Sequence, residues 1–93
     1  MKTKVYGRET HRSLEIDPFA DEGEATFHPL VTVSQDCSCA DFTWRCAEVN
    51  WFAIGDASAE GARKFAQALT HAADVAAKWS LELGGKKRRS KEA

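Results

Sequence analysis

The sequence predicts an α+β domain in which an antiparallel sheet of about three strands, in the order β-β-β-α, packs against one long C-terminal amphipathic helix. Apolar residues recur with helical spacing over residues 58–83, and segments 26–36 and 42–54 are rich in β-branched and aromatic side chains. At 93 residues the chain is expected to form a single small domain over residues 1–83, followed by a basic disordered tail over residues 84–93.

The first predicted strand lies within residues 4–16, where Leu14 and Ile16 supply its apolar side chains. Residues 17–24 follow as a loop that contains a proline, a glycine and four acidic residues. The loop is therefore expected to be exposed and negatively charged.

Segments 26–36 and 42–54 are predicted to pair as a hairpin through residues 37–41. Because successive side chains of a strand alternate between faces, this pairing predicts a core face covered by the helix. That face contains Phe27, Val31, Val33, Phe42, Trp44, Cys46, Phe52 and Ile54. The outer face carries an apolar group made of Leu30, Ala47, Val49 and Trp51. Glu48 and Asn50 interrupt the alternation, which indicates a bulge or an exposed strand end.

The helix is the clearest predicted element. Ser58 is expected to cap its N-terminus, with Glu60 in the first turn, where a carboxylate stabilises the positive end of the helix dipole. Its apolar stripe consists of Ala62, Phe65, Leu69, Ala72, Ala76, Trp79 and Leu83, widened by Ala66 and Ala73. Leu81 falls on the polar side, so the regular helix is expected to stop near Ser80.

Charge is distributed unevenly along the chain. The last eight residues hold five of the 13 basic residues and one of the 14 acidic residues, which leaves eight basic and 13 acidic residues in segment 1–85. An acidic body repels a phosphate backbone and suits a basic protein surface, whereas the tail has the opposite preference.

Candidate binding residues follow from these features. A solvent-facing cluster around a tryptophan resembles a binding hot spot, and the acidic loop suits a basic protein partner. The predicted partner-binding residues are Trp51, Val49, Leu30, Asp21, Glu22 and Glu24. An alternative is a nucleic-acid-associated accessory protein that uses Lys86, Lys87, Arg88, Arg89 and Arg45. Monomer and homodimer both remain open.

The cysteines suggest a further alternative, a small zinc-stabilised domain. Its candidate ligands are Cys37, Cys39, Cys46 and His28, with His11 as another donor. The spacing of the cysteines is not a familiar paired metal motif, and Cys46 is also explained as a core residue of its strand. We therefore expect no metal, no disulfide and no cofactor.

Catalytic motifs are missing from the sequence. There is no phosphate-binding loop, no dinucleotide fingerprint, no nucleophile elbow and no zinc-protease motif, and the three histidines form no constellation by spacing. A non-enzymatic function is expected. No signal peptide or membrane-spanning run is recognised, so we expect a cytoplasmic protein without membrane contact.

Part of the chain resembles a known group of small proteins. Residues 48–79 resemble small uncharacterised proteins of actinobacteria and their phages, which carry a strand, a turn and a helix of the type S/T-x-E-x-A-R-x-L/F-A-x-A-L-x-x-A-A-D. The matching stretch runs from Ser58 to Asp74, with Gly61 in place of the usual acid. The resemblance implies a small phage or bacterial accessory protein. The size and charge fit a phage-type inhibitor of a host factor.

Overall fold

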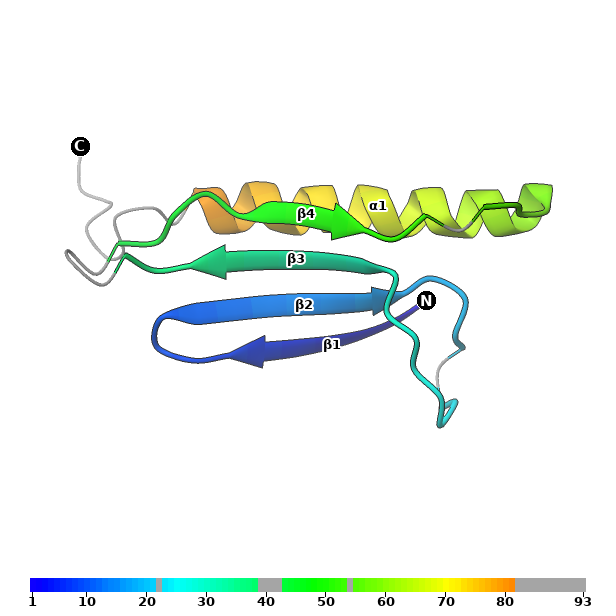
Figure 1. Ribbon diagram of the computed structural model, residues 1–93, viewed down its shortest axis with the longest axis horizontal. Coiled ribbons are helices and arrows are strands. Elements are labelled where there is room, and N and C mark those ends of the chain that lie inside the picture. Colours follow the sequence, from blue (N-terminus) through cyan, green and yellow to red (C-terminus); the bar gives the residue numbers. More distant parts are fainter. Residues whose placement is uncertain (22, 39–42, 54, 82–93) are drawn as a thin grey trace.

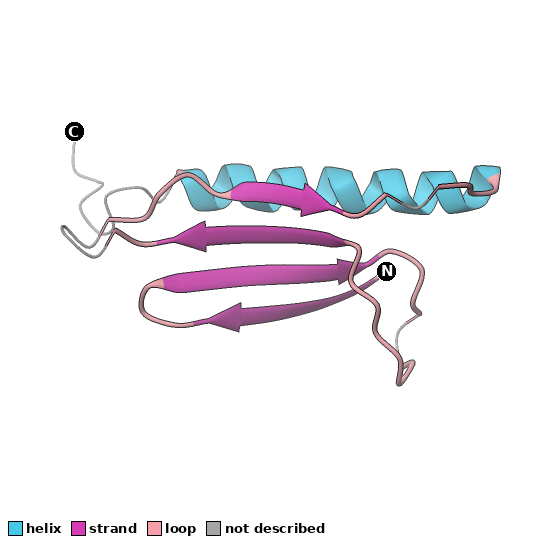
Figure 2. Cartoon of the chain, viewed as in Figure 1, coloured by secondary structure: helices cyan, strands magenta, loops and turns pink. Residues whose placement is uncertain are grey.

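The computed structural model describes residues 1–21, 23–38, 43–53 and 55–81 and contains one sheet and one long helix (Figure 1). The elements are β1 (Lys2–Gly7), β2 (His11–Asp17), β3 (Val31–Asp36), β4 (Glu48–Trp51) and α1 (Ala59–Ser80). The strands lie side by side in chain order, and each neighbouring pair is antiparallel (Figure 2). The predicted α+β class is confirmed, with four strands in place of about three.

The additional strand comes from the N-terminal segment, which forms a β1–β2 hairpin rather than one strand. Lys2 lies opposite Asp17 and Gly7 opposite Arg12 across this hairpin. The sequence of β1, KTKVYG, lacks apolar alternation because nearly all of the strand is exposed, so hydrophobic periodicity gave no signal there. Leu14 is buried on β2, as predicted.

Pairing between β3 and β4 corrects the predicted faces of the second segment. Val33 lies opposite Val49 and Val31 opposite Trp51, and directly opposed side chains share one face of a sheet. Val49, together with Ala47, therefore packs against the core beneath the helix rather than on the outer face. Trp51 belongs to the same side, although it is 60% exposed because β4 is an edge strand.

One extra residue before β4 causes this reversal. The ladder pairs Ser34 with Glu48, and an isolated bridge pairs Cys37 with Trp44. Two residues separate Ser34 from Cys37, but three separate Trp44 from Glu48. The irregularity lies just before the predicted break at Glu48 and shifts the alternation by one. Trp44 and Val49 consequently lie on the same side of the sheet.

Other predicted core residues also differ. Cys46 and Phe52 are exposed, because the shifted alternation places them outside the packed face. Phe27 is half-buried, and the Lys4 ammonium lies 4.6 Å from its ring centre. Phe42 and Ile54 lie outside the described residues.

The helix covers the sheet through a row of alanines. Ala68, Ala72 and Ala76 are buried against the β2 and β3 side chains, and their small size lets the helix axis approach the sheet closely. Larger side chains flank this row, namely Phe65, Leu69, Val75 and Trp79. Ala62, Ala66 and Ala73 of the predicted stripe are exposed, and Leu83 lies outside the described residues. Alanine is a strong helix former on either face, so its spacing alone does not identify the buried side.

Both predicted helix ends are correct. The Ser58 hydroxyl accepts a hydrogen bond of 3.0 Å from the Gly61 amide, which caps the N-terminus. The helix ends at Ser80, and Leu81 is exposed. Within the described ranges, no helix combines the length and apolarity needed to span a bilayer.

The C-terminal turn of α1 is fastened to the sheet by Gln35, which is only 1% exposed. Its amide nitrogen donates to the carbonyl oxygens of Trp79 (3.0 Å) and Arg45 (2.7 Å), and its amide oxygen accepts from Arg12 Nε at 2.7 Å. The Trp79 carbonyl is one of the last four of the helix, and the Leu81 amide at the C-cap also approaches it. The Arg12 guanidinium lies 4.4 Å from the Trp79 ring and 4.8 Å from the Trp44 ring.

The opposite face of the sheet is polar. It carries side chains such as Ser13, Glu15, Thr32 and Ser34, and His11 Nδ1 lies 2.7 Å from Asp36 Oδ1 across β2 and β3. The predicted outer apolar patch is therefore wrong, since the pairing register assigns its valine to the core.

Replacing Gln35 with leucine is expected to lower the free energy of unfolding by about 2–3 kcal/mol. The side-chain volume is nearly kept, while the Trp79 and Arg45 carbonyls lose the donor that Gln35 supplies and Arg12 loses an acceptor. Urea unfolding measures the difference. Ser34→Ala, in the same strand but on the polar face, serves as the control and should change stability by less than about 0.5 kcal/mol. A Gln35→Leu variant as stable as the wild type would contradict this role.

Candidate functional site

The candidate site surrounds the end of the sheet where β2 and β4 finish and β3 begins (Figure 1). Segment 18–30 connects β2 to β3 at this end, and segment 52–58 leads from β4 to the start of α1. Residues far apart in the sequence are thus brought to one end of the molecule.

Asp17 holds the first of these connections in place. It is 4% exposed, and its Oδ1 accepts from the amides of Phe19 (3.0 Å) and Ala20 (3.2 Å), while its Oδ2 accepts from the His28 amide at 2.7 Å. One carboxylate therefore ties the beginning of the loop to its end. Asp17 is a structural member of the predicted acidic loop.

Two other acids of the loop face solvent. Asp21 and Glu24 are exposed, and the Glu24 amide donates to the Asp21 carbonyl at 3.2 Å across a tight turn. Gly23 adopts a φ of 88°, a left-handed conformation that favours glycine. The Lys2 ammonium donates to the Glu24 backbone carbonyl, which joins the loop to β1. The predicted residue Glu22 lies outside the described residues.

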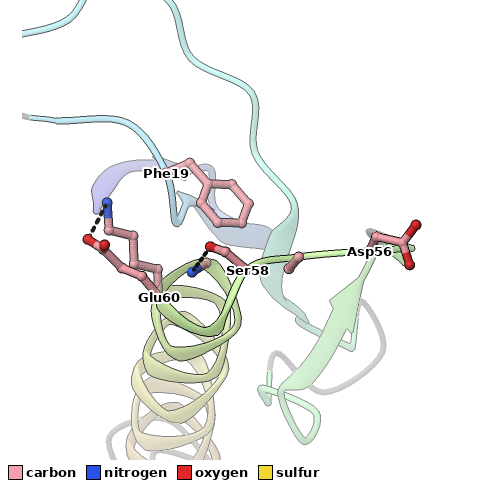
Figure 3. Close-up of a pocket in the computed structure, with 7 residues that line it drawn as sticks. Phe19, Asp56, Ser58 and Glu60 are labelled. Atoms are coloured by element: carbon pink, nitrogen blue, oxygen red, sulfur yellow. Dashed lines mark hydrogen bonds and ion pairs between the residues drawn. The ribbon is translucent and has the colours of Figure 1, made fainter.

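The second part of the site is the first turn of α1, over which Phe19 lies (Figure 3). A methyl group added to Gly61 would lie 3.8 Å from Phe19 Cε1, so the ring and the helix are close neighbours. Asp56 is exposed in the segment before the helix. Glu60 lies in the first turn, with its Oε2 3.7 Å from the Lys64 ammonium.

Two hollows meet at Phe19, which is 40% exposed. The larger, of about 520 Å³, lies against the helix and has Asp56, Glu60 and Lys64 among its lining residues. The smaller, of about 170 Å³, lies in the loop and includes Glu24. We call the group formed by Phe19, Asp21, Glu24, Asp56 and Glu60 the acidic end.

An aromatic pair, Trp51 and Phe52, adjoins the acidic end. Phe52 is 66% exposed, and its amide donates to the Leu30 carbonyl at 2.9 Å. Leu30 is half-buried and lines the smaller hollow together with Phe19. Leu30 therefore connects the smaller hollow to the end of β4, where two exposed aromatic residues follow one another. Aromatic faces attract ammonium and guanidinium groups, as carboxylates do.

The structure brings several predicted partner residues together. Asp21 and Glu24 belong to the acidic end, Leu30 lines one of its hollows, and Trp51 lies opposite Val31, the residue that follows Leu30. Val49 does not join them, because it packs against the core. The grouping thus differs from the predicted outer-face cluster.

Phe19, Asp56 and Glu60 were not identified as binding residues from the sequence. Phe19 is an aromatic residue inside an acidic loop, which is a usable signal for an exposed contact. Its position over the helix start depends on the Asp17 hydrogen bonds and has no local signature.

The residues of the two alternative sites, for nucleic acid and for zinc, are not brought together among the described residues. Arg45 is exposed and follows the Trp44 bridge, at the other end of β3, and the tail residues Lys86, Lys87, Arg88 and Arg89 lie outside the described residues. Cys37 and Cys46 are free thiols, and Cys39 is outside the described ranges. His28 precedes β3 while Cys37 follows it, a span of roughly 20 Å that excludes one shared ion. In the part of the chain that is described, no group of three or more potential metal ligands occurs.

Comparison with known proteins identified no relative. A scan against protein-family models and searches of curated proteins and of solved structures gave no match. Function is therefore inferred from the residues of this chain alone.

Replacing Asp17 with alanine is expected to destabilise the fold by about 2 kcal/mol, because three amides lose a charged acceptor. The same variant should be cleaved faster by protease within segment 18–28. Asp21→Ala removes an equal charge from the same loop and should change stability by less than about 0.5 kcal/mol. Urea unfolding and limited proteolysis check both results. Equal stability of the two variants would exclude Asp17 as the loop anchor.

Proposed function

We propose that this protein is a non-enzymatic binding protein whose acidic end holds a basic segment of a protein partner. The observation that supports the proposal is the position of Phe19, an exposed ring between two hollows with carboxylates around both. Arginine and lysine side chains bind such surroundings by stacking on the ring and pairing with the carboxylates.

The charges of the larger hollow favour an incoming cation. Asp56 forms no ion pair with a described residue. Glu60 pairs, among the described residues, only with Lys64, at 3.7 Å and with both side chains well exposed. An exposed ion pair of this kind contributes little, about 0–1 kcal/mol, so an arginine of a partner is able to replace Lys64 at small cost. Bidentate pairing with a guanidinium would also be stronger than the ammonium contact.

The aromatic pair extends the proposed contact. Trp51 is 60% exposed at the edge of the sheet, and tryptophan is among the residues most enriched in binding hot spots. In this proposal the basic segment runs from the hollow past Leu30 to Trp51. Apolar stems of lysine and arginine side chains would cover the two exposed rings.

A phage-type inhibitor of a host factor is the specific role that we favour. Proteins that bind nucleic acid present basic surfaces to the phosphate backbone, and an acidic surface competes for the same side chains. The acidic body of this chain supports this role.

Trp51→Ala is expected to weaken binding of the partner by about tenfold or more while changing stability by less than about 1 kcal/mol. The partner is captured from the native host, and its affinity for wild type and variant is then measured by calorimetry. A large loss of thermal stability without a specific loss of affinity would show that Trp51 is a core residue.

Charge reversal at the acidic end separates electrostatic attraction from general contact. Asp56→Lys should weaken binding, and the affinity of the wild type should fall as salt rises from about 50 to about 200 mM. Glu48→Lys carries the same charge change on the polar face of β4 and should leave affinity unchanged. Deletion of residues 84–93 should also have no effect on this affinity. If the deletion instead abolished binding, and nucleic acid competed with the partner for the tail, the accessory role in nucleic-acid binding would replace this proposal.

A further inference from the structure

The helix leaves one side of the sheet uncovered. In the described part of the chain, α1 contacts β2, β3 and β4 but not β1. In Figure 2 the helix overlaps β4 and leaves β1 free. Neighbouring strands lie about 4.8 Å apart, and a helix with its side chains is about 10 Å wide. The uncovered surface above β1 and the adjoining part of β2 is narrower than a helix, but β1 is an edge strand, so a bound helix can extend past the edge of the sheet.

A groove of about 500 Å³ lies on this uncovered surface. Its floor includes Val5, which is 69% exposed, and Leu14, which lies directly opposite Val5 and so on the same face. Its wall is the side of α1, with Val75 and Trp79. We call this surface, with Lys78 at its edge, the β1 groove. An apolar floor beside an apolar wall is the shape that an amphipathic helix fills.

The charges of the β1 groove are of one sign. Its ten lining residues are all described and include Arg12 and Lys78, and no aspartate or glutamate. The Arg12 guanidinium is engaged with two tryptophan rings and the Gln35 amide oxygen, so the exposed Lys78 supplies the charge available to a ligand. Lys78 forms no ion pair with a described residue, and Asp74, one turn earlier on the helix, does not line the groove. Groove and acidic end therefore attract opposite charges.

We propose that the β1 groove binds an acidic amphipathic helix of a partner protein, as a second surface distinct from the acidic end. The six residues of β1 span about 20 Å, which corresponds to about 13 helical residues or three to four turns. Apolar side chains of this helix at i, i+4 and i+7 lie on Val5, Leu14 and Val75. Carboxylates on its flank face Lys78.

The probe for this proposal is a synthetic helical peptide of about 14 residues with leucines at i, i+4, i+7 and i+11 and glutamates beside them. A matched peptide carries lysine in place of each glutamate. Binding of both peptides to the full chain is measured by fluorescence anisotropy. The acidic peptide is expected to bind at least about tenfold more tightly than the basic peptide.

Three variants locate the bound peptide. Val5→Glu should abolish binding of the acidic peptide without unfolding, because the side chain is exposed. Lys78→Glu should weaken the acidic peptide and strengthen the basic one. Arg63→Glu makes the same charge change at an exposed helix position outside the groove and should leave both affinities unchanged.

Several results would overturn the proposal. The proposal is wrong if neither peptide binds, or if both bind with equal affinity. It is also wrong if Lys78→Glu and Arg63→Glu lower the affinity for the acidic peptide by the same factor. A dimer that Val5→Glu dissociates in sedimentation would assign the groove to a second copy of the chain. None of these results bears on the acidic end, whose partner is tested by Asp56→Lys.

Discussion

The arrangement of the whole domain depends on the buried carboxamide of Gln35. This one side chain joins β3 to the last turn of α1, to Arg12 of β2 and to the irregular segment before β4. It supplies a donor to a carbonyl of the last helical turn, and its own amide nitrogen and oxygen are both hydrogen-bonded, which is required of a buried polar group. Ser80 adds a second connection, because its hydroxyl accepts a 3.0 Å hydrogen bond from the Ala47 amide. The helix end is thereby fixed over β3, and its lateral position on the sheet follows from that attachment.

The lateral position of the helix determines which surfaces remain open. Fixed over β3 and approaching closely through its alanines, α1 covers the centre of the sheet and leaves the two edge strands partly exposed. On one side, uncovered β1 forms the floor of the β1 groove with cations around it. At the other end, the first helical turn extends beyond the sheet and meets the loop that Asp17 holds in place. The β1 groove and the acidic end, which differ in the sign of their charge, both exist because a single helix cannot cover the whole sheet.

The sequence predicted those structural features that depend on local chemistry or on a strong hydrophobic periodicity. The fold class, the Ser58 cap, the helix end at Ser80 and the burial of Val31 and Val33 all follow from such signals. Sequence patterns did not predict β1, which has no covered face and hence no alternation. They indicated a bulge or an exposed strand end at Glu48 and Asn50, whereas the extra residue lies just before β4 and reverses the faces of Val49 and Cys46. Site residues divide in the same way. The acids of loop 17–24 were identified from the sequence. Asp56 was not, because it shares a hollow with Phe19 only once the hydrogen bonds of Asp17 hold the loop beside the helix.

Binding of a basic segment at the acidic end is tested most directly by hydrogen exchange on the complex with the partner captured from the native host. Amides in segments 19–21, 51–53 and 55–61 are expected to exchange more slowly in the complex than in the free chain, because binding excludes water there and stabilises both connections. Amides of β2 on the polar face should change little. Slower exchange confined to the polar sheet face, with no change in segments 19–21 and 55–61, would contradict the proposed site.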